Sequence, residues 1–175
     1  MQKNSKDVVI VSALRTVIGK YNGIWAKIEA HNLGKSVIQN ILSQSKVNQS
    51  SIDEVIMGQV LTGGTGQNPA RQAAKGAGIP DEKTAYVINQ VCGSGLRAII
   101  SGYQSILLND SKIVIAGGQE NMSFSNQDNM LQDGLVDAFN NYHMGVTAEN
   151  VAEKCNISRK EQDNFALSSQ TKTQE

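Results

Sequence analysis

Hydrophobic residues along this chain gather into short, dense runs separated by longer stretches in which they recur periodically. The short runs cover residues 8–11, 55–57 with 60–61, 86–91 and 112–116, and β-branched residues are frequent in them. Runs that are this short and apolar on both faces are typical of strands inside a covered sheet. The pattern therefore predicts four strands.

Between these runs the apolar residues follow helical spacing. One set precedes the second strand and another follows the third: Leu33, Val37, Ile38, Ile41 and Leu42, then Leu96, Ile99, Ile100, Tyr103, Ile106 and Leu107. A shorter helix is predicted over residues 69–78, because proline suits a first helical turn and glycine suits the position after the last. The alternation predicts an α/β fold, with a mixed, mostly parallel sheet and helices on both faces.

The composition changes after Gly118 to Asn, Gln, Asp and Ser, and no strand-like run appears again. We therefore place a boundary near Ser123 and divide the chain into an α/β domain, 1–122, and a second region, 123–175. That region is predicted to hold a helix over 147–155 and another that starts with a capping box at Ser158. This last helix meets no glycine or proline before the final residue, so we expect the complete protein to continue beyond it.

Cys92 is the strongest chemical candidate, because it lies where the third strand meets the long helix. Backbone N–H groups at a helix start have no intrahelical partner and favour negative charge, so we expect the thiolate to be stabilised there. A simpler reading is that a small residue fills the junction. Gly93 and Gly95 favour the reactive reading, since each costs about 0.5–1 kcal/mol of helix stability and brings no side chain to pack.

Other motifs are weaker. Ser94 lies between two glycines, but its surroundings do not fit the G-x-S-x-G nucleophile elbow. The glycines at 64 and 66 lack the third glycine of a dinucleotide-binding loop. Cys155 is far from Cys92 and neither has the spacing of a zinc site, so we expect no metal. Cys155 shares an apolar helix side with Val151 and is interpreted as a core residue.

Bulk properties exclude several classes of partner. The chain has 175 residues, of which 16 are basic and 16 acidic, so its formal net charge is zero. This balance argues against binding to nucleic acid or to an anionic membrane. No stretch approaches the roughly 18 apolar residues of a membrane span, and no signal-peptide pattern is present. We therefore expect a cytoplasmic protein.

Seven sequence blocks occur in an order that is known from one family. They are Arg15-Thr16 with Gly19 and Gly23, then 66–73, 89–96, 117–123, 133–139, 143–150 and 157–163. In these blocks the chain resembles the thiolases, of the acetyl-CoA acetyltransferase kind. The resemblance covers most of the chain and implies a thiolase-like N-terminal half.

The resemblance also implies roles for particular residues. It makes Cys92 the nucleophile that carries the acyl group as a thioester, with its own N–H as an oxyanion donor. It makes His143 and Met144 part of the tunnel for the pantetheine arm and acyl group, although a histidine beside a methionine is more often a packing residue. The residues that it implies as structural support are Asn89, Gly93, Gly95, Gly117, Gly118 and Glu120.

For the whole protein, the resemblance implies the reversible conversion of two acetyl-CoA molecules into acetoacetyl-CoA and CoA, a step of lipid metabolism. Coenzyme A thioesters are then substrates, and no cofactor is expected. Residues 123–175 would begin the CoA-binding region. The loop after Ser123 is shorter than the loop that joins dimers in tetrameric thiolases, so we expect a homodimer.

Two motifs of the family do not occur in these 175 residues: Gly-His-Pro, which supplies an activating histidine, and Cys-x-Gly-Gly-Gly, which supplies a second cysteine. We therefore expect the chain to be inactive alone. Two alternatives stay open, namely a non-catalytic CoA-binding or dimerising protein, and one subunit of a split thiolase with a separate C-terminal half. A cysteine-based redox or hydrolytic enzyme is disfavoured, because no resolving cysteine or Cys/His/Asp set is apparent.

Overall fold

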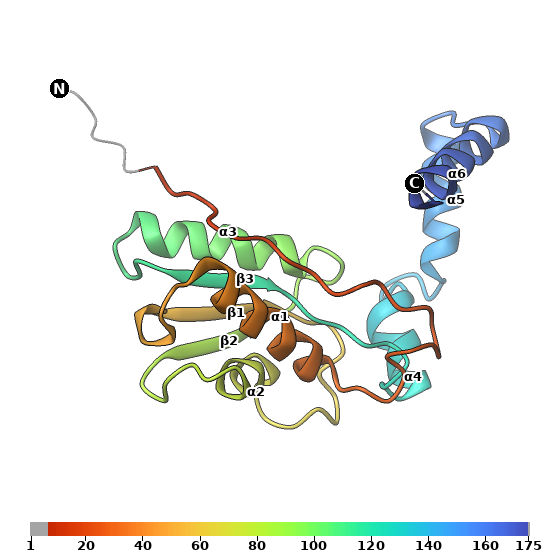
Figure 1. Cartoon of the computed structure of the whole chain (residues 1–175). Coiled ribbons are helices and arrows are strands. Elements are labelled where there is room, and N and C mark those ends of the chain that lie inside the picture. Colours follow the sequence, from red (N-terminus) through yellow and green to blue (C-terminus); the bar gives the residue numbers. More distant parts are fainter. Residues whose placement is uncertain (1–6, 175) are drawn as a thin grey trace. The chain divides into compact units, whose positions relative to one another are not determined.

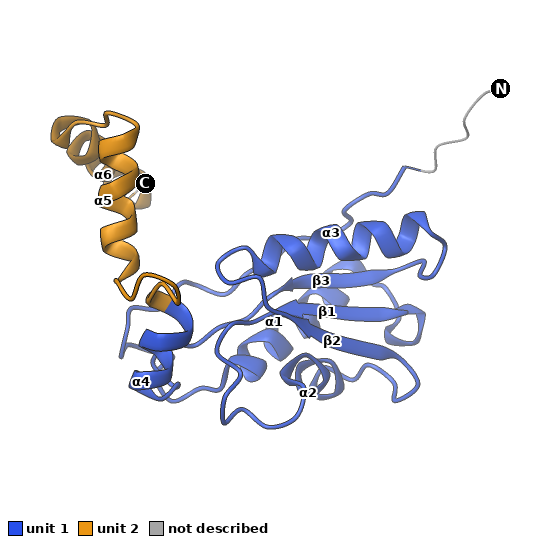
Figure 2. Cartoon of the chain, turned by 180° about the vertical axis from the view of Figure 1, so that it is seen from behind, with its two compact units in different colours: residues 1–134 blue, residues 135–175 orange. Residues whose placement is uncertain are grey.

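The computed structural model describes residues 7–174 and is shown in Figure 1. The chain forms two compact units, Met1–Gly134 and Leu135–Glu175, which Figure 2 colours separately. Among the described residues, the first unit contains the three strands and the second contains α5 (Met144–Lys154) and α6 (Arg159–Gln174). The boundary near Ser123, which was drawn from composition, stays a prediction about how the complete protein is organised.

The first unit is built on a parallel sheet of three strands. These are β1 (Glu54–Gly58), β2 (Thr84–Ile88) and β3 (Val114–Gly118), in the spatial order β2-β1-β3. Glu54 lies opposite Thr84 on one side and opposite Val114 on the other. Because the strands are parallel and helices separate them along the chain, the α/β class expected from the sequence is confirmed.

One face of the sheet is covered by α1 (Ala30–Ser45) and α2 (Pro69–Gly76), which also pack against each other. Proline begins α2 as predicted, and the Asn68 side chain caps it by accepting a hydrogen bond from the Arg71 N–H. The main core lies between these helices and the sheet. It consists of Ile38, Leu42, Ile52, Val55, Met57, Ala70, Ala73, Ala74, Ala77, Ile79 and Ile115.

The opposite face is covered by α3 (Ser94–Leu107), as Figure 1 shows. Side chains alternate across a strand, so Ile56 faces α3 while its neighbours face the main core. Gly102 lets the helix approach β3, since a Cβ there would lie 3.0 Å from Cγ1 of Val114. The outer side of α3 is solvent-exposed and apolar, through Leu96, Ile99, Ile100, Tyr103, Leu107 and Leu108.

The remaining short elements are the 3₁₀ helix η1 (Gln49–Ser51), α4 (Gln127–Asn129) and the π-helix η2 (Met130–Leu135), whose last residue is the first residue of the second unit. Of these, η1 leads into β1, and α4 with η2 follows the polar segment after β3. Among the described residues no strand follows β3, as the composition after Gly118 predicted.

The second unit holds α5 (Met144–Lys154) and α6 (Arg159–Gln174). The predicted capping box is present: the Ser158 N–H donates to Oε2 of Glu161 over 2.7 Å, and the Glu161 N–H donates back to Oγ of Ser158 over 3.3 Å. These two bonds satisfy backbone donors at the helix start and explain where α6 begins. Neither helix contains a buried residue.

The strand predicted over residues 8–11 is wrong, because that segment is not a strand in the structure. Val9, Ile10 and Val11 are 70–79% exposed. Apolar, β-branched composition favours a strand only where a neighbouring strand supplies hydrogen-bond partners. Both edges of β1 are taken by β2 and β3, and residues 8–11 pair with neither outer edge of the sheet. The other predicted strands are present, with boundaries shifted by a few residues.

Three segments of backbone meet closely at the carboxyl ends of β1 and β3. A Cβ added to Gly58 would lie 2.6 Å from the Gly95 nitrogen, and one added to Gly118 would lie 3.4 Å from the Gly95 Cα. Real Cβ atoms do not approach backbone atoms as closely as the first of these distances. The start of α3 can therefore sit against the sheet only because Gly58 has no side chain.

Replacing Gly58 with alanine is expected to destabilise the protein by about 1–3 kcal/mol, since the new Cβ would meet the backbone of Ser94 and Gly95, which cannot rotate aside as a side chain could. Gly117 is the matched control, because it lies on a neighbouring strand and nothing comes within 4 Å of a Cβ placed there. Urea unfolding followed by circular dichroism measures both variants. Equal effects of Gly58→Ala and Gly117→Ala would contradict this account of the contact.

Asp53 ties the start of β1 to the start of β3. Its Oδ2 accepts hydrogen bonds from the N–H groups of Lys112, over 2.7 Å, and Ile113, over 3.1 Å. These bonds, with Lys83 nearby, hold the pKa of the Asp53 carboxyl below its usual value of 3.8, the bond from Lys112 being the largest cause. The charged form of Asp53 therefore stabilises the sheet.

We expect Asp53→Ala to lower the free energy of unfolding by about 1–2 kcal/mol at neutral pH, a modest value because the side chain is a third exposed. Since the folded pKa lies below the unfolded one, the contribution is present above pH 3.8 and is lost as the pH falls through the folded value. Urea unfolding at several pH values tests this. Asp53→Asn keeps an acceptor oxygen and should lose only the pH-dependent part.

Candidate active site

Cys92 lies in the turn between β2 and α3, and its side chain is exposed. The N-cap of α3 is Gly93, so the thiol lies two residues before the first helical residue, Ser94, rather than within the first turn. The chain closes this turn through a hydrogen bond from the Gly93 N–H to the Gln90 carbonyl over 3.0 Å. The nucleophile candidate is thus presented at the tip of a short connection.

The residue before the thiol, Val91, has a left-handed backbone with φ of 49°. This conformation is unfavourable for a β-branched residue, by about 1–3 kcal/mol, and persists only where its surroundings enforce it. Two side chains hold it: Oδ1 of Asn89 accepts from the Val91 N–H over 2.9 Å, and the Ser94 hydroxyl donates to the Val91 carbonyl over 2.6 Å. The same hydroxyl accepts from the Gln90 N–H over 2.8 Å.

Two backbone N–H groups near the start of α3 have no hydrogen-bond partner in the described part of the chain. Among residues 7–174, no partner is found for the N–H of Cys92 or for that of Gly95. Donors of this kind at the start of a helix can receive an oxygen that gains negative charge. Of the two, the N–H of Cys92 belongs to the same residue as the thiol, so it suits the oxygen of a carbonyl that this thiol attacks.

The supporting residues proposed from the resemblance lie at the carboxyl ends of the strands. Gly118 is in close contact with the start of α3, whereas Gly117 faces open space. The Glu120 carboxylate accepts from the N–H groups of Val60, over 2.8 Å, and Leu61, over 3.2 Å, and so joins the segments that follow β1 and β3. Desolvation raises the pKa of the Glu120 carboxyl, and the two N–H donors act in the opposite direction.

A second link joins the same two segments next to Glu120. The Gln119 side-chain amide donates to Oε1 of Gln59 over 2.8 Å, and Gln59 donates to the Leu61 carbonyl over 2.9 Å. Both glutamines are buried, so water does not compete for these bonds. The segments after β1 and β3 are thereby joined by polar links, and the last glycines of these two strands contact the start of α3.

His143 and Met144 belong to the unit of residues 135–175, whereas Cys92 and the supporting residues belong to the other unit. His143 caps α5, since its Nδ1 accepts a hydrogen bond from the Gly145 N–H over 3.0 Å. Met144 is the first residue of α5 and is half-buried. The part in substrate binding that the resemblance implies for them stays a prediction.

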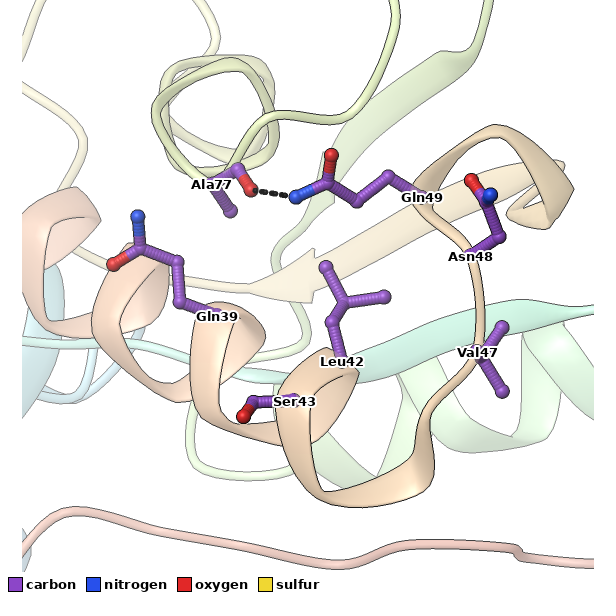
Figure 3. Close-up of a pocket in the computed structure, with 7 residues that line it drawn as sticks. All are labelled: Gln39, Leu42, Ser43, Val47, Asn48, Gln49 and Ala77. Atoms are coloured by element: carbon purple, nitrogen blue, oxygen red, sulfur yellow. Dashed lines mark hydrogen bonds between the residues drawn. The ribbon is translucent and has the colours of Figure 1, made fainter.

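Two hollows lie on the first unit. The larger, with a volume of about 470 Å³, is formed by the end of α1, by η1 and by Ala77 after α2, and Figure 3 shows Gln49 reaching across it to the Ala77 carbonyl. None of the candidate site residues lines it. The smaller, of about 350 Å³, lies at the carboxyl ends of β1 and β2 and includes Asn89 in its wall. Because Asn89 belongs to the turn that carries Cys92, the smaller hollow is the one that bears on the candidate active site.

Three further features bear on function. No group of His, Cys, Asp and Glu side chains that could hold a metal ion occurs in the described part of the chain. None of the described helices combines the length and apolar character that a membrane crossing requires. The interpretation of Cys155 as a core residue is wrong: it is exposed at the C-terminal cap of α5, where helix α5 buries nothing.

Cys92 and Cys155 form a natural comparison, because both thiols are exposed, but Cys92 directly precedes the N-cap of α3 and Cys155 is the C-cap of α5. Helix N-termini favour an attacking thiolate and C-termini disfavour it, so we expect iodoacetamide to alkylate Cys92 about three- to tenfold faster. Peptide mass spectrometry of a time course measures both rates in one sample. In urea the two rates should become similar. Equal rates in the folded chain would contradict the prediction.

The sequence reasoning missed the structural part played by Val91 and Ser94. Ser94 was weighed only as a nucleophile, yet it is buried and bonds to backbone on both sides. Serine close to a helix start is a recognisable signal for such local bonding. Nothing in the sequence points to a left-handed valine, since valine rarely adopts that conformation.

Comparison with known proteins agrees with this geometry. The family described as "Thiolase, N-terminal domain" matches residues 8–130 and 123–175. The chain therefore belongs to the thiolase family.

Similar proteins include an acetyl-CoA acetyltransferase of Rhizobium meliloti, 48% identical over 98% of this chain and 48% of the relative. Another from Pseudomonas aeruginosa is 50% identical over 95% of this chain and 47% of the relative. A protein of Rattus norvegicus named "Acetyl-CoA acetyltransferase, cytosolic" is 47% identical over 99% of this chain and 48% of the relative. The chain spans about half the length of the curated relatives it matches.

Proposed function

We propose that this chain provides the nucleophile of an acetyl-CoA acetyltransferase and carries the acetyl group on Cys92. The observation that carries the proposal is the exposed Cys92 thiol at the β2–α3 turn, in a residue whose own backbone N–H has no hydrogen-bond partner among the described residues. Family membership and relatives named acetyl-CoA acetyltransferase support it.

In the first half-reaction the Cys92 sulfur, as a thiolate, attacks the thioester carbonyl carbon of acetyl-CoA. A new carbon–sulfur bond forms and the carbonyl oxygen gains negative charge, which the Cys92 N–H can receive. The bond to CoA sulfur then breaks, and CoA leaves as a thiolate that takes up a proton. Since one thioester replaces another, the step is nearly balanced in energy and can run in either direction.

In the second half-reaction the methyl carbon of another acetyl-CoA loses a proton and attacks the acetyl group on Cys92. A carbon–carbon bond forms, the bond to the Cys92 sulfur breaks, and acetoacetyl-CoA results. This step needs a base for the methyl proton and a group that activates the thiol. The family supplies them from Gly-His-Pro and Cys-x-Gly-Gly-Gly, which do not occur in these 175 residues, so we assign condensation to the complete protein.

The remaining assignments are part of the same proposal. His143 and Met144 contact the pantetheine arm or acyl group, and Asn89, Gly95 and Glu120 shape and support the nucleophile turn. No cofactor is needed, because the thioester itself is the activated group. The cytosolic rat relative supports a cytoplasmic location, and the shortened loop after Ser123 supports a homodimer.

The purified chain should show negligible thiolysis of acetoacetyl-CoA, and activity should appear when the second half of a bacterial relative is added as a separate polypeptide. Acetyl-CoA should then leave one acetyl group on Cys92, which intact-protein and peptide mass spectrometry detect. Cys92→Ala should remove the label, while Cys155→Ser, the matched thiol control, should keep it.

The outcomes separate the candidate functions. Robust turnover by residues 1–175 alone would refute the need for a second half. Binding of CoA with no label on Cys92 in the reconstituted protein would instead favour a non-catalytic CoA-binding protein. An acetyl label on Cys155 rather than on Cys92 would contradict the assignment of Cys92 as the nucleophile.

A further inference from the structure

We infer that Ser94 is a positioning residue for Cys92: its hydroxyl bridges the Gln90 N–H and the Val91 carbonyl and so keeps Val91 left-handed, which fixes where the thiol points. The inference rests on the proposed role of Cys92 as nucleophile. It concerns a residue that touches no substrate and acts only through the turn.

The Ser94 hydroxyl both donates and accepts a hydrogen bond in this arrangement. A serine hydroxyl can donate one hydrogen bond and accept others, and here it donates to Val91 over 2.6 Å and accepts from Gln90 over 2.8 Å. Ser94 is 4% exposed, so water cannot replace either bond readily. Loss of the hydroxyl would leave the Gln90 N–H without this partner.

The backbone conformation that the Ser94 hydroxyl stabilises at Val91 is an unusual one. Val91 has φ of 49°, although valine strongly disfavours the left-handed region. Packing of the Val91 side chain does not stabilise this conformation, because the side chain is 50% exposed. The left-handed backbone of Val91 is therefore held by hydrogen bonds: its N–H donates to the Asn89 side chain, and its carbonyl accepts from the Ser94 hydroxyl and, over 3.1 Å, from the Ser94 N–H.

The two hydrogen bonds of the Ser94 hydroxyl, called the clamp below, matter for chemistry because of where they lie in the chain. Val91 is the residue immediately before Cys92, so a change in its backbone angles would change the direction in which the Cys92 thiol and the free Cys92 N–H point. The Ser94 backbone is also in contact with the sheet, because Gly58 of β1 packs directly against it. The sheet thus holds Ser94, Ser94 holds Val91, and Val91 directs Cys92.

The test measures iodoacetamide alkylation of Cys92 relative to Cys155 in the same chain, over neutral and mildly alkaline pH. Ser94→Ala should lower this ratio several-fold, towards that of an ordinary exposed thiol. Ser105→Ala is the matched control, since it removes another hydroxyl of α3 that bonds to Ser111 over 3.0 Å. It should leave the ratio within about twofold of the parent chain, as Ser105 does not contact the turn.

A second substitution distinguishes positioning from simple helix stabilisation. Glycine adopts left-handed angles without steric cost, so Val91→Gly should restore most of the ratio when combined with Ser94→Ala. If Ser94→Ala does not fold, Asn89→Ala decides instead, because it removes the other side-chain bond to Val91 and should lower the ratio in the same direction. An unchanged ratio in the variant that folds, or failure of the Val91→Gly rescue, overturns the inference.

This experiment needs no coenzyme A, so it can fail independently of the proposed function. A lowered and rescued ratio in a protein that never becomes acetylated would support the clamp and refute the acetyltransferase assignment. Acetylation of Cys92 that is unaffected by Ser94→Ala, with an unchanged alkylation ratio, would support the assignment and refute the clamp.

Discussion

The contact on which the site depends is the meeting of Gly58, Gly118 and the first residues of α3. Side chains normally keep a helix away from a sheet, but here backbone lies against backbone because two strands end in glycine. This closeness fixes the start of α3 at the carboxyl edge of a parallel sheet, where α/β folds commonly place their functional groups. The direction in which Cys92 points then follows from a few local hydrogen bonds.

The polar groups around that contact link segments that are far apart in the sequence. Glu120 bonds to the backbone of Val60 and Leu61, and Gln119 bonds to Gln59, so the segment after β3 is tied to the segment after β1. Asp53 performs a similar task at the opposite ends of these strands. A small sheet of three strands therefore gains rigidity from its polar links as well as from its apolar core.

The two sides of the sheet differ in how completely they are covered. The side under α1 and α2 holds the main core, whereas α3 buries Ala98 against the sheet but leaves a row of large apolar side chains in water. The apolar segment 8–11 is also exposed. These surfaces belong to a chain that matches only about half the length of its relatives.

Patterns in the sequence determined the α/β class, the family and the choice of Cys92, because these depend on the order of residue types and on short motifs with fixed spacing. They predicted β1, β2 and β3 for the same reason: each is a dense apolar run. They could not tell that residues 8–11 lack a pairing partner, that Cys155 is exposed, or that Val91 is left-handed. Each of these is decided by which distant backbone or side chain comes near, such as Ser94 at Val91, and that proximity exists only once the chain has folded.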